Sequence, residues 1–179
     1  MGGADRFLAF LRDELKPWVR DRYGVDPDDS VFFGDSLGGL FATHALLSEP
    51  RVFARYGIGS PSLSWDDHAM LGRAAAYAAG HDDLPAKVFV SVGALESLEG
   101  FQRFLDQVPA EQRAKLEAEA AEDPPVDMVD DAERLVTTLR EGGYPGLELE
   151  YEVLPGEYHE TAPPLNLSRS LRYLLGAPR

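Results

Sequence analysis

A serine set between glycines is the residue of this sequence whose surroundings best suit covalent chemistry. Residues 34–38 (GDSLG) match the pattern G-x-S-x-G around Ser36. A short apolar run, residues 30–35 (SVFFGD), leads into the motif, and residues 38–48 (GGLFATHALLS) have a helical pattern. A serine on a sharp strand-to-helix turn has its hydroxyl lifted above the sheet, where it can attack a carbonyl carbon. The alternative is a glycine-rich turn in which the serine only caps the helix.

Such a turn makes demands on the residues around the serine. It forces Ser36 into a strained backbone conformation, and side chains two residues before and after it would collide. We therefore expect Gly34 and Gly38 to provide the room that the turn needs. The turn also places the Leu37 N–H at the start of the following helix. We predict that this N–H, together with the helix dipole, stabilises the oxyanion formed when a carbonyl is attacked.

A serine hydroxyl also needs a base to remove its proton, and the sequence holds four histidines. Where the nucleophile sits in this kind of turn, an acid and then a histidine follow it along the chain. His159 fits that place, since it lies in a loop after the last predicted strand. His44 is expected to pack inside the helix after the serine, and His68 and His81 to be solvated beside a polar helix. We therefore predict that His159 is the general base.

The acid that orients this histidine should follow the preceding strand. Residues 87–93 (KVFVSVG) lead directly into Ala94, Leu95 and Glu96. We predict that Glu96 orients the imidazole and stabilises its positive form. Glu99 is the nearest alternative. A third possibility is that both carboxylates lie on the surface, so that Ser36 and His159 would act as a dyad.

These residues can meet only if strands and helices bring them to one edge of a sheet. Strands are predicted at residues 30–35, 55–60, 87–93 and 147–154. Helices are predicted at residues 5–23, 38–48, 66–79, 126–141 and 165–175, with further helical material over 99–121. Strands that alternate with helices favour a mostly parallel sheet with flanking helices. Because there is no internal repeat or low-complexity linker, we predict a single α/β domain over residues 1–179.

Composition narrows the possible partners. The chain has 179 residues, 44% hydrophobic and 27% charged, which suits one globular domain with a sizeable core. The absence of cysteine excludes disulfides and thiolate chemistry, and a net charge of -14 argues against nucleic acid. No apolar run approaches the ~20 residues that span a bilayer. The N-terminal residues mix charges with apolar side chains, unlike a signal peptide. We therefore expect a cytoplasmic protein with no membrane contact.

Several segments resemble an esterase family of the α/β-hydrolase superfamily, the one that includes the enterochelin and ferri-bacillibactin esterases. The resemblance lies in residues 34–67 (GDSLGGLFATHALLSEPRVFARYGIGSPSLSWDD), 90–96 (VSVGALE) and 153–175 (VLPGEYHETAPPLNLSRSLRYLL). It implies a serine esterase that hydrolyses small-molecule carboxylic esters through an acyl-enzyme on Ser36, with no cofactor or metal. It also implies that Ser60 and Trp65 border the substrate pocket, although Trp65 could equally be a packing residue.

The sequence departs from the family pattern in two ways. Family members are usually longer, and the strands that normally precede the serine strand are absent, together with a loop that gives a second oxyanion N–H. We therefore expect a truncated α/β-hydrolase fold, either a fragment or a miniature enzyme. Losing one such donor typically lowers the rate by roughly 10²–10³. In addition, Asp35 stands where His or Gln is more usual, and it could alter pKa values nearby.

Two other functions remain possible for this sequence. Acyl transfer to an alcohol would use the same acyl-enzyme, and an impaired domain kept for binding or oligomerisation would lack the second oxyanion donor.

The missing strands also bear on assembly. With no strand on its outer side, the segment 30–35 would form an open apolar edge, and such edges pair with other chains. We therefore expect a homo-oligomer, most simply a two-fold dimer. The alternative is that helix 5–23 covers this edge.

Overall fold

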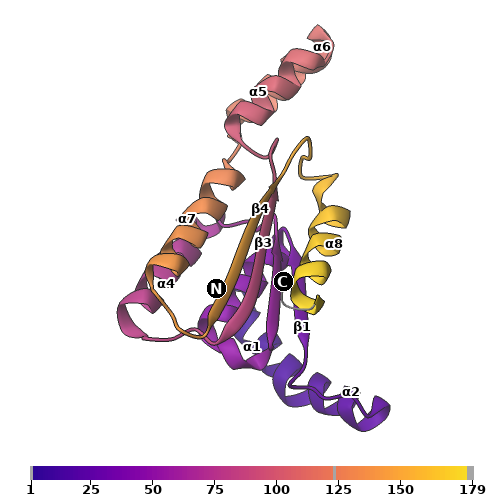
Figure 1. Cartoon of the computed structure of the whole chain (residues 1–179). Coiled ribbons are helices and arrows are strands. Elements are labelled where there is room, and N and C mark those ends of the chain that lie inside the picture. Colours follow the sequence, from indigo (N-terminus) through magenta and orange to yellow (C-terminus); the bar gives the residue numbers. More distant parts are fainter. Residues whose placement is uncertain (1, 123, 177–179) are drawn as a thin grey trace.

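The computed structural model describes residues 2–122 and 124–176, which form an α/β fold around a parallel sheet (Figure 1). The four strands, in their order across the sheet, are β1 (Val31–Asp35), β2 (Arg55–Gly59), β3 (Ala86–Gly93) and β4 (Leu147–Leu154). Each strand matches its predicted run to within one residue at either end, and each neighbouring pair is parallel. The predicted fold class is confirmed.

The middle strands are apolar because helices cover both of their faces. Side chains such as Tyr56, Ile58 and Val90 are fully buried, as expected for parallel strands between two helical layers. At one edge of the sheet, β4 exposes Glu148 and Glu150 in alternation. At the other edge, β1 pairs with β2 alone among the described strands. The strand that leads into Ser36 is therefore an edge strand.

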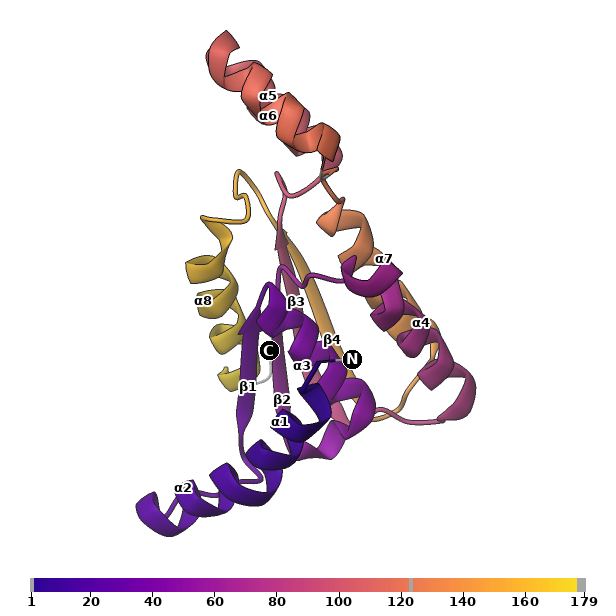
Figure 2. The same cartoon turned by 180° about the vertical axis from the view of Figure 1, so that it is seen from behind.

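Helices lie on both faces of the sheet, as Figures 1 and 2 show. On one face, α8 (Ala162–Leu175) packs across β1, β2 and β3. On the other face, α3 (Leu37–Ser48) packs on β1 and β2, and α7 (Met128–Glu141) packs on β3 and β4. Between them, α4 (Trp65–Gly80) contacts both α3 and α7, and a short 3-10 turn, η2 (Pro50–Val52), follows α3. The carboxyl ends of all the strands therefore open into loops at the same edge of the sheet, the edge at which α/β folds place their ligands.

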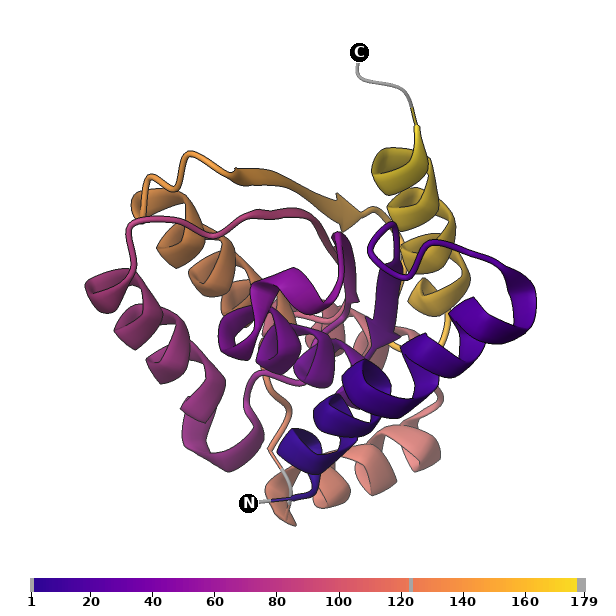
Figure 3. The ribbon, with the colours of Figure 1, turned by 90° about the horizontal axis from the view of Figure 1, so that it is seen from below.

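The N-terminal helix extends past the amino ends of the strands (Figures 1 and 2), and Figure 3 views the molecule from this end. It consists of α1 (Ala4–Phe10), a π-helical turn η1 (Leu11–Leu15) and α2 (Lys16–Tyr23). Its first half packs against α3, where the ring centroids of Phe7 and Phe41 are 5.0 Å apart. Leu8 and Leu11 are buried, but Trp18 is 56% exposed. The apolar side chains of this helix are thus buried only in part.

The helical region expected over residues 99–121 consists of two helices, α5 (Leu98–Gln107) and α6 (Ala110–Glu122). The break falls at Val108, whose backbone is extended (φ -86°, ψ 151°), because a residue before proline disfavours the helical conformation. Both helices project past the carboxyl ends of β3 and β4 (Figure 1). Within residues 2–122 and 124–176, no helix is both long enough and apolar enough to cross a membrane.

Candidate active site

Ser36 lies on the sharp turn between β1 and α3, in a backbone conformation that non-glycine residues rarely adopt (φ 58°, ψ -119°). Its N–H donates a hydrogen bond to the Gly59 carbonyl on β2 at 3.0 Å, which ties the turn to the neighbouring strand. A side chain at Gly34 would bring a Cβ to 2.1 Å from the Gly38 carbonyl oxygen. The turn therefore requires glycine at position 34, and it holds the serine in a strained and fixed position.

The second glycine that the packing requires is Gly39 rather than Gly38. A Cβ on Gly38 would meet no described atom within 4 Å beyond its chain neighbours and the backbone of its own helix, so the clash expected there is wrong. A Cβ on Gly39 would lie 2.6 Å from the Gly59 carbonyl oxygen and 3.0 Å from the Pro61 Cα. The reason is that Gly39 on α3 lies against the end of β2 and the loop that follows it, so the constraint comes from helix-to-strand packing.

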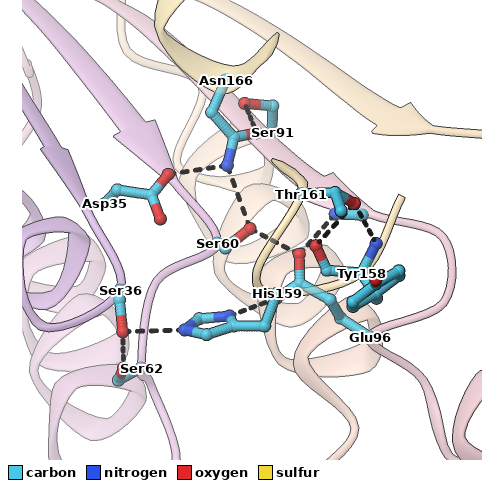
Figure 4. Close-up of polar contacts among 11 residues, drawn as sticks. Asp35, Ser36, Ser60, Ser62, Ser91, Glu96, Tyr158, His159, Thr161 and Asn166 are labelled. Carbon is cyan, nitrogen blue, oxygen red and sulfur yellow. Dashed lines mark hydrogen bonds and ion pairs between the residues drawn. The ribbon is translucent and has the colours of Figure 1, made fainter. Parts of the chain in front are cut away.

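His159 joins Ser36 to Glu96 by two hydrogen bonds (Figure 4). Its Nε2 lies 3.0 Å from the Ser36 Oγ, and its Nδ1 lies 2.7 Å from the Glu96 Oε2. The three residues come from the loops after β4, β1 and β3. Glu99 instead pairs with Arg103 on the exposed surface, at 2.6 Å. The structure thus brings together Ser36, His159 and Glu96, and it places Glu99 elsewhere.

The Glu96 carboxylate is buried and receives donors on both oxygens. Its side chain is only 1% exposed, whereas that of His159 is 39% exposed. The Oε1 accepts hydrogen bonds from the Ser60 hydroxyl at 2.6 Å and from the Gly93 N–H at 2.7 Å. Donors of this kind offset the loss of water around a buried carboxylate and fix its plane. The arrangement suits a group that must hold an imidazole in one orientation.

Ser60 does not border a substrate pocket, contrary to the prediction. It is fully buried, and its hydroxyl is engaged with Glu96. The hydroxyl that faces the nucleophile belongs to Ser62, whose Oγ lies 3.3 Å from the Ser36 Oγ. A serine-proline-serine run gives no sign of which hydroxyl points outward. The direction depends on the backbone, since Ser60 has a φ of 34° that turns its side chain toward Glu96.

Trp65 lies on the wall of an open groove beside the serine turn. The groove has a volume of about 870 Å³ and is formed by α1, α3 and α4. Trp65 is 47% exposed there, and Leu37 and Gly38 also line the groove. Because Leu37 is the first residue of α3, its N–H is among those that find no acceptor within the helix. This N–H is therefore available to a developing negative charge.

A second cavity, of about 650 Å³, lies beside His159 and Glu96. Its walls come from α5, α6, the start of α7 and the loop after β4, and they are largely apolar. The apolar side chains are those of Leu95, Phe101, Phe104, Leu116, Pro125, Val126, Met128 and Tyr158. The second cavity thus lies next to His159, whereas the groove that Trp65 lines lies next to the serine turn.

Asp35 and Asn166 form a polar contact next to the nucleophile. The sequence analysis singled out Asp35 but missed Asn166. The Asn166 Nδ2 donates to the Asp35 Oδ2 at 2.7 Å and to the Ser60 Oγ at 3.0 Å. Burial raises the pKa of Asp35 above its ordinary value, and the hydrogen bond from Asn166 opposes this rise. The shift shown here is that of Asp35 itself, and the expectation that Asp35 alters pKa values nearby stays a prediction. The signal that could have pointed to Asn166 is its place on the stripe of α8 that repeats every four residues and is buried, with Ala162, Ser170 and Leu174.

The other three histidines make no contact with Ser36 within the described chain, and one of them differs from the prediction. His44 is buried, as expected, and burial together with the nearby Arg73 guanidinium lowers its pKa. His81 stacks on the Tyr77 ring, with centroids 3.9 Å apart. His68 is not simply solvated, because its Nε2 lies 3.0 Å from the buried Asp131 carboxylate and links α4 to α7.

Comparisons with known proteins agree with this architecture. The family model described as "Putative esterase" matches residues 1–131. The ferri-bacillibactin esterase BesA of Bacillus subtilis is 29% identical over 176 residues, which cover 97% of this chain and 52% of that protein. Among solved structures, the siderophore hydrolase EstA from Aspergillus nidulans superposes with a TM-score of 0.81 at 30% identity, covering 98% of this chain and 58% of that one.

A second solved structure, the BES protein from Bacillus cereus, has a TM-score of 0.72 at 27% identity, over 97% of this chain and 55% of that one. The chain thus spans about half the length of the relatives that it matches. The match extends over nearly all of the described sheet and helices, and it includes the serine turn. The chain therefore belongs to this esterase family.

Proposed function

We propose that this protein hydrolyses carboxylic esters through an acyl-enzyme on Ser36. The observation that carries the proposal is the hydrogen-bonded line from Ser36 through His159 to the buried Glu96, with distances of 3.0 Å and 2.7 Å. A nucleophile, a base and an orienting acid at these distances are what acyl transfer requires. The names of the relatives, an esterase and a siderophore hydrolase, support the same reaction class.

In the first half of the reaction, the Ser36 Oγ attacks the ester carbonyl carbon while the His159 Nε2 takes its proton. Glu96 stabilises the resulting imidazolium, and the Leu37 N–H donates to the oxyanion. The tetrahedral intermediate collapses as His159 returns the proton to the departing alcohol, which leaves the acyl group on Ser36. In the second half, His159 removes a proton from water, the hydroxide attacks the acyl carbon, and the acid is released with Ser36 restored.

The substrate class follows from the walls of the two cavities. Both are open and largely apolar, so an ester with sizeable groups on each side of the bond can reach the serine. Siderophore esters are the substrates that the names of the relatives favour. We also propose that the molecule forms a homo-oligomer, because β1 is an edge strand and the helix beside it exposes Trp18 and other aromatic side chains.

The test of the reaction is the loss of Ser36. Ser36→Ala should lower the hydrolysis of a nitrophenyl ester by ~10³-fold or more, because the members of such a triad act as a unit. A fluorophosphonate should label wild-type protein on Ser36 alone, as shown by peptide mass spectrometry. Ser64→Ala, in the same segment as Ser62 and Trp65, is the matched control and should keep both activity and labelling. Activity that survives in the Ser36→Ala variant would sink the proposal.

A further inference from the structure

A chain of buried polar groups continues beyond Glu96 and ends beside the nucleophile. From Glu96 it passes to the Ser60 hydroxyl, then to the Asn166 amide, and then to the Asp35 carboxylate (Figure 4). Ser60 and Asn166 are both fully buried. Neither touches the space that a substrate can enter, so their role must be exerted through the residues that they contact.

The direction of each hydrogen bond in this chain is determined by the chemistry of its members. The Asn166 Nδ2 can only donate, and its two protons go to the Asp35 Oδ2 at 2.7 Å and to the Ser60 Oγ at 3.0 Å. The Asn166 Oδ1 accepts from the Ser91 hydroxyl at 2.7 Å, which holds the amide in this orientation. Since Ser60 accepts from Asn166, its single proton is left for the Glu96 Oε1, at 2.6 Å.

The sheet makes room for this contact at one position. Gly59 lies opposite Asp35 in the register of β1 and β2. A Cβ on Gly59 would lie 2.3 Å from the Asp35 Oδ2 and 2.9 Å from the Asn166 Cβ. The absence of a side chain at Gly59 is therefore what allows the carboxylate and the amide to meet across the strand.

We propose that Asn166 is a positioning residue for the triad, which fixes the direction of the Ser60 hydroxyl and thereby the orientation of Glu96. The inference rests on the proposed function. Asp35 supplies the second acceptor that keeps the Asn166 amide turned toward Ser60. The nucleophile turn and the acid loop, which come from different strands, are in this way joined through one side chain of α8.

The decisive experiment exchanges the residues at positions 35 and 166. Asn166→Asp removes both donors and should lower kcat about tenfold or more with little change in KM, since a hydrogen bond to a charged group is lost and no substrate contact is altered. The double variant Asp35→Asn with Asn166→Asp restores the pair with the donor now on position 35, and it should recover thermal stability. Position 166 then accepts the Ser60 proton instead of directing it to Glu96, so kcat should stay low.

Two serine variants provide a matched comparison that does not depend on the folding of the Asn166→Asp variant. Ser60→Ala should lower kcat about tenfold. Ser170→Ala, on α8 and equally buried, should leave kcat unchanged, since the Ser170 hydroxyl has no hydrogen-bond partner within the described residues. Rates of Ser36 labelling by the fluorophosphonate should follow kcat in all variants.

Recovery of kcat together with stability in the exchanged variant would overturn the inference and leave the proposed function intact, because it would show a purely structural role. Equal kcat values for Ser60→Ala and Ser170→Ala would overturn it as well. A wild-type protein that neither hydrolyses the ester nor reacts with the fluorophosphonate would overturn the proposed function and this inference with it.

Discussion

Two carboxylates flank the nucleophile, and they differ in what stabilises their charge. Glu96 receives hydrogen bonds from His159, Ser60 and the Gly93 N–H, whereas Asp35 receives one from Asn166. Burial raises the pKa of Asp35, and the hydrogen bond from Asn166 offsets this rise only in part. The folded protein therefore binds a proton at Asp35 more tightly than the unfolded chain does, and the charged form of Asp35 lowers stability.

This difference predicts a pH-dependent effect of Asp35→Asn. In the wild type, the contribution of Asp35 to stability is greatest below its ordinary pKa and is lost as the pH rises through the raised pKa of the folded state. The free energy of unfolding of the variant should therefore increase relative to wild type as the pH rises above the ordinary pKa of an aspartate, about 3.9. Urea denaturation at several pH values measures this difference in the free energy of unfolding. Asp82→Asn, at an exposed position, is the control, and a difference that shrinks as the pH rises would contradict the prediction.

The Ser62 hydroxyl lies 3.3 Å from the Ser36 Oγ, and it approaches from another direction than His159 (Figure 4). We expect it to hold the Ser36 hydroxyl in line for attack. Ser62→Ala should lower kcat for a nitrophenyl ester about tenfold, which is less than the loss caused by Ser36→Ala. Steady-state kinetics beside the Ser64→Ala control tests this, and equal rates for the two variants would rule it out.

At the scale of the elements, the close packing of α3 on β2 at Gly39 holds the serine turn in place. It predicts opposite effects for two adjacent glycines. Gly39→Ala should reduce the free energy of unfolding by about 1–3 kcal/mol, because its Cβ would overlap the Gly59 carbonyl oxygen. Gly38→Ala should be neutral or stabilising by up to about 1 kcal/mol, because its Cβ meets open space and alanine favours the helix. Chemical denaturation compares them, and equal losses at both positions would refute the argument.

The elements were predictable from sequence to the extent that each is one continuous pattern. The strands are short apolar runs bounded by turns, and Ser36 and His159 lie in segments that carry their own signals. The contacts of Asn166 could not be predicted, because it meets Asp35 across 131 residues of sequence and only the packing of α8 on the sheet brings them together. The outward direction of Ser62 rather than Ser60 likewise depends on backbone angles that three residues do not specify.

At the scale of the whole molecule, the protein combines a strongly negative net charge with an N-terminal helix that exposes aromatic side chains. The net charge is -14, yet Phe7, Phe10, Trp18 and Tyr23 on the N-terminal helix are exposed. This helix packs on α3, and the outer edge of β1 is paired with no other described strand. Exposed apolar side chains near the outer edge of a strand that pairs on one side only favour association with another chain.

This contrast predicts a homo-oligomer, most simply a two-fold dimer, that buries the N-terminal helix. Sedimentation at micromolar concentration should give a mass above 19.7 kDa. Trp18→Glu should shift the population toward monomer, whereas Leu175→Glu, at an exposed position at the end of α8, should not. A monodisperse and active monomer of the wild type would refute the proposal.

The loop after β3 reaches Glu96, the helix α7 begins at Met128, and these two points are joined by hydrogen bonds. The Met128 N–H donates to the Glu96 carbonyl at 2.9 Å, and the Leu98 N–H donates to the Asp127 carboxylate at 3.2 Å. The helices α5 and α6 between them are therefore an insertion whose ends meet. Doubling the length of such an insertion costs only about 0.6 kcal/mol. In evolution, one wall of the cavity beside His159 can thus diverge among relatives, and with it the choice of ester, while Glu96 keeps its place.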